Sequence, residues 1–341
     1  MKIGLLTGGG DAPGLNGIIE AVTKTLLHHG HDVVGLCDGF EGVFNQNIKQ
    51  LNLKDVEGLH AMAGTLLGTS NKTGTKGRED EFRSQLKKLR LDVLIAAGGD
   101  GTFRGLSDFS QDIPLIGVPK TIDNDLPGTD VTFGFDTACT VVQEAIESLK
   151  ATADAHRRIF FVETMGRTAG WIALRGGLTG YADLILLPEF PIQIKQLITV
   201  VKEKLKKSRG LVICVAEGAH ISGEKVLVQK IVEGSPQAER YGGIAHHLAT
   251  LVEQETSEEC RHVVLGHLQR SRFPTTADRM LTLSMGVEAA RMAIEKDFNK
   301  AVVTLDGKIK RVPIETFFAP VKEVQAQHEW VQLARELEMM I

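Results

Sequence analysis

The chain has 341 residues, of which 43% are hydrophobic and 24% charged, the proportions of a globular protein with room for two hydrophobic cores. Its net charge of −4 gives no electrostatic reason to expect nucleic acid or an anionic membrane as a partner, so an anionic ligand would need local positive charge. Four scattered cysteines without a CxxC pair, and an N-terminus with no signal peptide or membrane-spanning run, predict a cytoplasmic protein with reduced thiols.

The first predicted unit is a strand, a glycine-dense turn and a helix. The strand covers residues 3–6, the turn is TGGGDAPG at 7–14, and apolar residues recur at helical spacing over 15–27. Glycines in such a turn let backbone N–H groups approach a phosphate, and a helix N-terminus favours an anion. The turn has neither the Gly-Lys-Ser/Thr of a Walker A motif nor the dinucleotide fingerprint, so a plain glycine turn remains the alternative here.

The next segments are less specific. A second strand is predicted over residues 32–37, and residues 64–72 are rich in glycine and hydroxyl side chains. The polar segment 72–81 is expected to be an exposed loop. The alternative is a mobile lid that brings Lys72 or Lys76 near a nucleotide.

A second unit of the same kind follows. Residues 82–89 are predicted to be helical, and residues 91–97 form an apolar run typical of a buried strand. The run leads into Gly-Gly-Asp-Gly-Thr at 98–102 and a helix from Phe103. Glycines that clear space for phosphates are chemically compatible with Asp100 at the apex of the turn, where it would meet Mg²⁺.

An acidic loop follows the third buried run. Residues 113–118 predict a strand, and the sequence PKTIDND follows it at 119–125. Asp123 and Asp125, two residues apart in an extended loop, would point the same way at a strand end, where open parallel sheets bind ligands. The pair suits one Mg²⁺, or a base beside a metal ligand, and an Asx-rich turn is the alternative. Three such loops, each ending a strand, together predict an α/β enzyme that handles phosphates.

The second half of the chain repeats the α/β pattern. We expect a helix over 137–152, strands over 159–163, 183–188, 210–217 and 261–270, and an amphipathic helix over 323–340. The tail helix is expected to pack Trp330, Leu333 and Leu337 into the core. Arginines flank the predicted strands, which favours recognition of an anion by guanidinium forks; these are Arg158, Arg167, Arg261 and Arg270.

These motifs, in this order, resemble the phosphofructokinase family from residue 3 to about 292. The motifs are TGGGDAPGLN, GGDGT, PKTIDND, ETMGR at 163–167, AEGA at 216–219 and GHLQR at 266–270. NAD kinases and lipid kinases share only GGDGT. The resemblance implies two similar Rossmann-like three-layer α/β domains with the active site in the cleft between them. It places the phosphoryl-donor (nucleotide) domain at 1–138 plus 251–301, and the fructose 6-phosphate-binding domain at 139–250 plus 302–341.

The resemblance also implies an activity in glycolysis, the Mg²⁺-dependent transfer of the ATP γ-phosphoryl to the 1-hydroxyl of fructose 6-phosphate. Asp123 resembles the catalytic base, and Arg167, Thr121 and Lys120 are the other expected catalytic residues. The expected donor-binding residues are Gly10, Asn71, Lys72, Gly99, Gly101 and Thr102, and the expected metal ligands are Asp100 and Asp125. The expected substrate-binding residues are Thr121, Asp123, Asp125, Arg158, Met165, Gly166, Arg167, Glu217, Arg261, His267 and Arg270. Of these, Arg158 and Arg261 would come from a neighbouring subunit of a homodimer or homotetramer.

Departures from the family pattern bear on the phosphoryl donor. Lys120 stands where ATP-dependent bacterial enzymes have Gly and pyrophosphate-dependent relatives have Lys, whereas Gly101 stands where those relatives carry Asp. Because Gly101 leaves room for the α-phosphate region of ATP, ATP is the predicted donor and pyrophosphate the alternative. Asn71 replaces an Arg near the phosphates of the typical ATP enzyme.

Other departures bear on regulation. Glu20 and Lys24 occupy positions that carry effector-binding Arg in bacterial enzymes activated by ADP and inhibited by phosphoenolpyruvate. Because an acidic Glu20 would repel an anionic effector, regulation of that kind is predicted to be weak or absent. A more distant alternative is a non-catalytic sugar-phosphate-binding subunit, which would be expected to have lost Asp100, Asp123 or Arg167.

Overall fold

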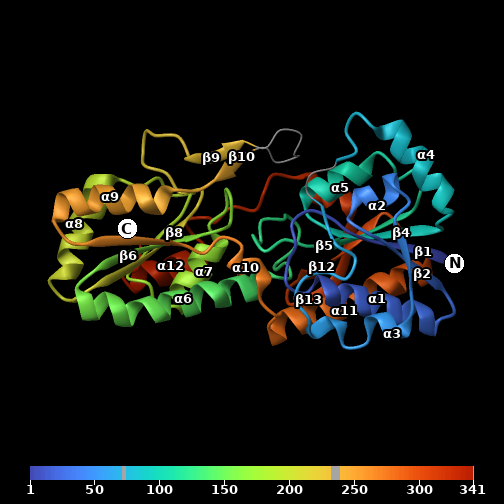
Figure 1. The fold of residues 1–341 in the computed structure, drawn as a ribbon, viewed down its shortest axis with the longest axis horizontal. Helices are drawn as coiled ribbons and strands as arrows, with labels where there is room; N and C mark the ends of the chain where they lie inside the picture. The colour runs from blue at the N-terminus through green and yellow to red at the C-terminus, as the bar shows by residue number, and fades with distance from the viewer. Residues whose placement is uncertain (71–73, 232–238, 341) are drawn as a thin grey trace.

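A computed structural model of the chain describes residues 1–70, 74–231 and 239–340, which form two α/β lobes side by side along the long axis of the molecule (Figure 1). Each lobe has a sheet with helices on both faces, so the expected fold of two three-layer α/β units is confirmed. No helix within the described ranges has both the length and the apolar character needed to cross a bilayer. All four cysteines are unbridged, as the sequence predicts.

The larger lobe contains a seven-stranded sheet in the order β13-β12-β5-β4-β1-β2-β3. Its strands are β1 (Lys2–Thr7), β2 (Asp32–Leu36), β3 (Ile48–Leu51), β4 (Val93–Gly98), β5 (Leu115–Pro119), β12 (Lys300–Leu305) and β13 (Lys308–Pro313). The pairs involving β1, β4 and β5 are parallel, and the outer strands β3 and β13 pair antiparallel. Because β1, β4 and β5 are neighbours in the sheet and run parallel, the three loops after them all lie at the carboxyl ends of the strands.

Helices cover both faces of this sheet. One face packs against α1 (Leu15–His28) and α11 (Thr276–Glu295), and the other carries a phenylalanine-rich cluster that includes Phe82, Phe103 and Phe109. The remaining helical segments are α2 (Phe40–Phe44), α3 (Leu53–Val56), η1 (Leu59–Ala61), α4 (Glu79–Leu89), α5 (Asp100–Ser107) and η2 (Ile314–Phe318). Gly14 precedes α1 with φ 103°, a conformation that favours glycine.

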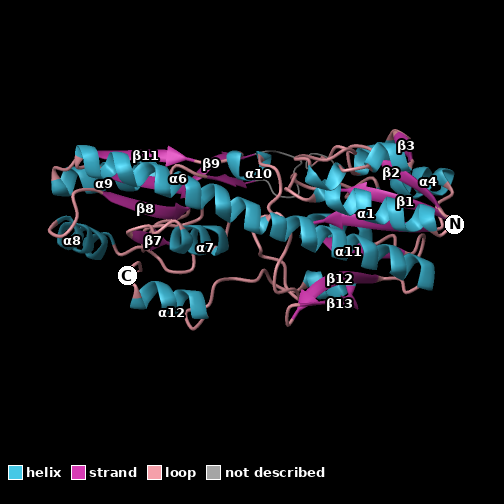
Figure 2. Cartoon of the chain, turned by 90° about the horizontal axis from the view of Figure 1, so that it is seen from below, coloured by secondary structure: helices cyan, strands magenta, loops and turns pink. Residues whose placement is uncertain are grey.

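The smaller lobe contains a four-stranded parallel sheet in the order β11-β6-β8-β7. Its strands are β6 (Ile159–Thr164), β7 (Leu184–Leu186), β8 (Leu211–Ala216) and β11 (Cys260–Val264), and its helices are α6 (Phe135–His156), α7 (Trp171–Thr179), α8 (Ile194–Leu205), α9 (Ile244–Thr256), α10 (Leu268–Ser271) and α12 (Glu329–Glu336). Two short strands, β9 (Val228–Ile231) and β10 (Glu239–Tyr241), form a separate antiparallel pair. Figure 2 shows α6 running along the smaller lobe toward the α1 and α11 pair of the larger one.

The expected domain boundaries are wrong in two places. The stretch 251–301 contains β11, which pairs with β6 in the smaller sheet. The stretch 302–341 contains most of β12 and all of β13, which belong to the larger sheet because β12 pairs parallel with β5. The larger lobe is therefore built from residues 1–134 and about 272–318, and the smaller lobe from the rest of the described chain.

Two predicted elements are also corrected. The strand expected over 261–270 ends at Val264, and a turn and α10 hold the remaining residues. The helix expected over 323–340 covers only Glu329–Glu336. The helix starts late because the preceding residues cross between the lobes. Its buried side chains are Val331 and Ala334, three residues apart on one face, whereas Leu333 and Leu337 are exposed.

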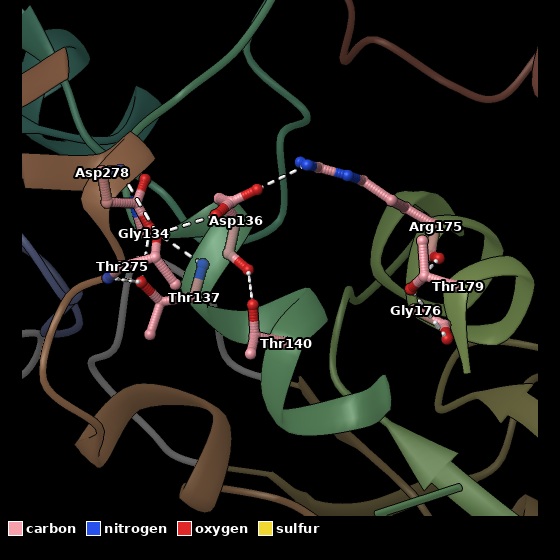
Figure 3. Close-up of polar contacts among 9 residues, drawn as sticks. All are labelled: Gly134, Asp136, Thr137, Thr140, Arg175, Gly176, Thr179, Thr275 and Asp278. Atoms are coloured by element: carbon pink, nitrogen blue, oxygen red, sulfur yellow. Dashed lines mark hydrogen bonds and ion pairs between the residues drawn. The ribbon is translucent and has the colours of Figure 1, made fainter. Parts of the chain in front are cut away.

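A buried carboxylate joins two of the places where the chain passes between the lobes (Figure 3). Asp278, in the first turn of α11, is 1% exposed and accepts hydrogen bonds from the backbone N–H of Gly134 (2.9 Å) and of Thr137 (2.8 Å). The hydroxyl of Thr137 donates to the same carboxylate at 2.5 Å. Asp278 therefore caps the start of α6, the helix that enters the smaller lobe.

The same junction extends to α7. The Thr275 hydroxyl donates to Asp136 at 2.7 Å, and Asp136 forms an ion pair with Arg175 of α7 (Figure 3). The starts of α6 and α11 are thus tied to the helix that follows the predicted substrate-binding motif ETMGR.

Candidate active site

The two glycine turns lie against each other at the ends of the adjacent strands β1 and β4. The Gly8 N–H donates to the Ala97 carbonyl at 2.9 Å. A Cβ atom on Gly8 would lie 2.7 Å from the Thr102 hydroxyl oxygen, and one on Gly98 would lie 2.4 Å from it. Glycine is therefore required at both positions for the turns to pack around Thr102.

Lys120, at the start of the acidic loop, reaches into the first glycine turn. Its backbone N–H donates to the Gly98 carbonyl at 2.9 Å, and its ammonium donates to the Gly10 carbonyl. Lys120 is 3% exposed, and burial, followed by the neighbouring Arg270, lowers its pKa to about 7. The three loops that the sequence predicts to handle phosphates are thus brought together, with a buried amine between them.

The acidic loop holds Asp123 with one oxygen unused. The Asp123 N–H donates to the Thr121 hydroxyl at 3.1 Å, and Asn124 adopts φ 54° while its side chain accepts from the Thr132 N–H at 3.0 Å. Asp123 is 5% exposed, and its buried Oδ1 makes no hydrogen bond within the described part of the chain. A buried carboxylate oxygen without a donor is the arrangement expected of a base that accepts a substrate proton.

Asp125 completes a cluster of acidic groups. Burial, with the nearby Asp123 and Asp100, raises the pKa of Asp125 to about 7. The described residues contain no group of three or more His, Cys, Asp or Glu side chains placed to hold a metal by themselves. This donor set fits Mg²⁺, which is commonly bound by one or two carboxylates together with substrate phosphates and water. Asp100 and Asp125 are the residues that would hold it.

The smaller lobe contributes Arg167 and Glu217 from the ends of β6 and β8. The Arg167 N–H donates to the Glu217 carboxylate at 3.0 Å. A Cβ atom on Gly218 would lie 1.9 Å from the Arg167 carbonyl oxygen, so glycine is required there for the two loops to meet. Burial raises the pKa of Glu217 to about 7, and the charge of Asp123 adds to this shift. That electrostatic effect places Glu217 near the acidic loop of the other lobe.

Arg270 in α10 makes a second link between the lobes. Its guanidinium donates to the Asp11 carbonyl at 2.6 Å, and a Cβ atom on Gly10 would lie 3.2 Å from the same nitrogen, Nη1. His267 immediately precedes α10 and is exposed. Met165 and Gly166 lie between β6 and Arg167, and Gly99 and Gly101 border Asp100 at the start of α5.

Two predicted substrate ligands lie elsewhere in this chain. Arg158 precedes β6, so it is separated from Arg167 by the length of that strand, about 20 Å at 3.3 Å per residue. Its Nε lies 2.6 Å from Glu259, which also pairs with Arg261 on β11. Within one chain, therefore, neither guanidinium joins the site. Asn71 and Lys72 lie outside the described residues.

Some polar residues at the site were given no role from the sequence. The Glu163 carboxylate accepts from the N–H groups of Gly243 and Ala245, which caps α9. Thr164 and Gln269 are buried, and each has a side-chain oxygen with no partner among the described residues. Glu163 belongs to the motif ETMGR and Gln269 to the motif GHLQR, so membership of a motif could have indicated both residues from the sequence. Lys322, which lies between η2 and α12, stands in no motif.

Glu20, the residue predicted to repel an anionic effector, is paired with side chains of its own chain. Glu20 is 4% exposed, with Lys24 at 2.6 Å and the ring of His60 at 2.8 Å. Burial opposes ionisation of Glu20, but the hydrogen bonds from Lys24 and His60 outweigh it and lower the pKa. The cation of Lys24 is therefore engaged by the chain's own carboxylate.

The fold and the site define a two-lobed α/β phosphotransferase. The model of the phosphofructokinase family matches residues 2–293. The chain is 41% identical to the ATP-dependent 6-phosphofructokinase 2 of Clostridium perfringens over 98% of this chain and 97% of that one. It is 42% identical to the ATP-dependent 6-phosphofructokinase of Mycobacterium tuberculosis strain H37Rv, covering 92% and 93%. It is 40% identical to the pyrophosphate–fructose 6-phosphate 1-phosphotransferase of Amycolatopsis methanolica, covering 95% and 96%. The chain belongs to the phosphofructokinase family.

Solved structures agree with this fold. The T-state phosphofructokinase of Pichia pastoris matches with a TM-score of 0.81 and 28% identity, over 99% of this chain and 36% of that longer one. The pyrophosphate-dependent phosphofructokinase of Marinobacter aquaeolei matches with a TM-score of 0.83 over 99% and 90%, and at 20% identity it supports the fold alone.

Proposed function

We propose that this chain is an ATP-dependent 6-phosphofructokinase, which transfers the γ-phosphoryl of ATP to the 1-hydroxyl of fructose 6-phosphate. The observation that carries the proposal is Asp123, a buried carboxylate in the loop whose Lys120 reaches the first glycine turn. One oxygen of Asp123 has no hydrogen-bond partner among the described residues. Phosphoryl transfer depends on positioning and charge neutralisation, with an acidic residue to accept the proton of the attacking hydroxyl. Asp123 has the residue type, the place and the free acceptor for that task.

The other residues take roles that fit their positions. The turns containing Gly10 and Gly101 would hold the donor phosphates, and the guanidinium of Arg167 would stabilise charge on the transferred group. Mg²⁺ held by Asp100 and Asp125 would neutralise phosphate charge. Met165, Gly166, Glu217, His267 and Arg270 would bind the sugar phosphate. On this proposal the larger lobe binds the donor and the smaller lobe binds fructose 6-phosphate.

Pyrophosphate is the second candidate donor, and Lys120 is the observation that favours it. A buried ammonium between the glycine turns is a cation for a compact anion, and relatives of nearly equal identity carry either donor in their names. Gly101 favours ATP because it adds no side chain beside the donor turn. The test is a pair of assays with fructose 6-phosphate and either ATP or pyrophosphate at equal concentrations. Faster turnover with pyrophosphate would reject ATP as the physiological donor.

A shared site in a homodimer or homotetramer would supply the missing arginines. Arg158 and Arg261 are both paired with Glu259 at the far end of the small sheet, and Arg261 is exposed. Their guanidinium groups would bind the 6-phosphate of a substrate held by a neighbouring subunit. Mixing inactive Asp123→Ala chains with inactive Arg261→Ala chains would restore activity if subunits share sites. Mixed assemblies without restored activity would argue against it.

A further inference from the structure

The C-terminal crossing between the lobes contacts the acidic loop directly. After η2, residues 319–324, which we call the strap, leave the larger lobe and lead toward α12 (Figures 1 and 2). Immediately before the strap, in η2, Phe317 stacks on Phe103 of α5 with ring centroids 4.7 Å apart, and Arg104 donates to the Phe318 carbonyl at 3.1 Å. The strap therefore begins on the helix that follows the second glycine turn.

Lys322 is the point where the strap meets the acidic loop. Its backbone N–H donates to the Asp125 carbonyl at 2.7 Å. Its ammonium donates to the carbonyls of Thr129 (2.9 Å) and Asp130 (3.0 Å). Carbonyl groups of an irregular loop have no strand or helix partners, so one residue supplying three donors fixes the course of the backbone there.

The other side of Lys322 is attached to the smaller lobe. The indole N–H of Trp171, the first residue of α7, donates to the Lys322 carbonyl at 2.6 Å. The Lys322 ammonium lies 5.4 Å from the centroid of the same indole ring. Two residues later, the Val324 N–H donates to the Glu189 carboxylate at 2.9 Å, and Glu189 also accepts from the Gly170 N–H at 2.9 Å. The strap is thus tied to the segment that directly follows Arg167.

We propose that Lys322 is a positioning residue for phosphoryl transfer, because it fixes the acidic loop that carries Asp123 and Asp125 relative to the Arg167 segment. The proposal rests on the proposed function and adds a residue to it. Lys322 lies beyond residue 293, where the match to the family model ends. Its effect on the rate would pass through Asp123, since Lys322 touches the backbone of the loop and not the reacting groups.

The test compares Lys322→Met with wild-type full-length chain. Methionine keeps the long apolar stem and the backbone donor, and removes only the ammonium. Because small misplacements of reacting groups cost up to about 100-fold in rate, we expect kcat to fall by about 10- to 100-fold. The KM for fructose 6-phosphate should change little. The matched control is Lys204→Met, which removes another lysine-to-carbonyl hydrogen bond, to Glu338 at 2.7 Å, in the same C-terminal region and should leave kcat unchanged.

A double-mutant cycle separates positioning from general stabilisation. In an Asp123→Ala background, Lys322→Met should cause a much smaller loss of the residual rate than in wild type, because the base that it positions is absent. Equal losses in both backgrounds, or an unchanged kcat in the single variant, would overturn the proposal. If Lys322→Met fails to fold, Trp171→Phe removes the indole donor and should lower kcat in the same way, with a much smaller effect in the Asp123→Ala background.

Fluorescence gives a readout that does not depend on turnover. The chain has two tryptophans, so a Trp330→Phe variant leaves Trp171 as the sole reporter of the strap. Lys322→Met should shift its emission to longer wavelength and increase quenching by acrylamide, whereas Lys204→Met should not. An unchanged spectrum would show that the ammonium does not hold the strap in place. Wild-type chain inactive with both donors would instead reject the proposed function.

Discussion

The ammonium of Lys120 donates a hydrogen bond to the carbonyl oxygen of Gly10, so the loop after β5 reaches into the loop after β1. Burial and Arg270 lower the pKa of this lysine to about 7, which makes it easily neutralised in the absence of an anion. An anionic donor bound at the glycine turn would favour the charged form. Binding of the phosphoryl donor and the protonation of Lys120 are therefore coupled.

Replacing Lys120 with methionine should weaken donor binding. A hydrogen bond to a charged group is worth about 1.5–3 kcal/mol, which corresponds to about a 10- to 100-fold rise in the KM for the donor. The loss should be larger for pyrophosphate than for ATP, because ATP keeps contacts through its nucleoside. Steady-state kinetics with each donor measure it, and Lys54→Met, at an exposed position on α3, is the control. Equal KM values for variant and wild type would exclude Lys120 from the donor site.

Asp123→Ala should abolish most turnover without loss of sugar-phosphate binding. Removing a general base costs about 10²–10⁴ in rate. His267 and Arg270, which are proposed to bind the sugar phosphate, lie just before and within α10 and not on the acidic loop. The Kd for fructose 6-phosphate measured by calorimetry should therefore change little. Turnover close to that of wild type would remove Asp123 from the role of base.

The pKa of Asp125 predicts a pH-dependent requirement for Mg²⁺. Burial, Asp123 and Asp100 raise this pKa to about 7, so the carboxyl is largely protonated below that pH and a poor metal ligand. The Mg²⁺ concentration for half-maximal rate should therefore fall as pH rises through about 7. In Asp125→Asn, which cannot titrate, the concentration should be high and nearly independent of pH over the same interval. A wild-type profile as flat as that of the variant would contradict the assignment.

Asp278 should give the folded chain a characteristic dependence on pH. Burial raises its pKa from 3.8 to about 6, although hydrogen bonds from Thr137 and Gly134 oppose the shift. Between these values the folded state holds a proton that the unfolded state has lost, so the free energy of unfolding falls as pH rises from 3.8 to about 6 and is level above it. The slope from this group is at most about 1.4 kcal/mol per pH unit.

Chemical unfolding of wild type and Asp278→Asn at a series of pH values measures that slope. The variant should lack the slope that Asp278 causes. It should also be less stable at every pH, because the amide NH₂ group cannot accept the hydrogen bonds that the carboxylate accepts, at a cost of about 1–3 kcal/mol. Asp80→Asn, which alters an exposed carboxylate in the first turn of α4, serves as control and should keep the slope. Identical slopes in all three chains would rule out titration of Asp278.

The sequence predicted the parts of the fold that local patterns determine. The apolar runs before the two glycine turns and the acidic loop became β1, β4 and β5. These strands are parallel and lie in the order β5-β4-β1, so the loops after them meet and Lys120 reaches Gly10. The placement of residues after 260 depended on long-range pairing, which no local pattern records. The parallel partner of β12 is β5, more than 180 residues earlier, and this pairing moved the expected boundary between the lobes.

The residues of the candidate site also divide into those that a local motif indicates and those that depend on long-range contacts. Asp123, Arg167, Glu217 and Arg270 stand in motifs whose residue types indicate their chemistry, and the structure brings their segments together. Lys322 stands in a stretch with no motif, and its contacts are mainly with backbone carbonyls, which every residue possesses. Sequence gives no signal for a contact of that kind.

The position of β12 between β5 and β13 has a consequence for synthesis of the chain. Until the ribosome has released residues up to Leu305, the end of β12, β5 has one unpaired edge, even though the smaller sheet is complete at Val264. An exposed edge strand is a site for pairing with other chains. A nascent or truncated chain that stops at residue 293, where the family match ends, would thus hold a finished small sheet beside an open large one. Expression of such a fragment should give aggregates, and protection of the acidic loop should begin only after β12 has been made.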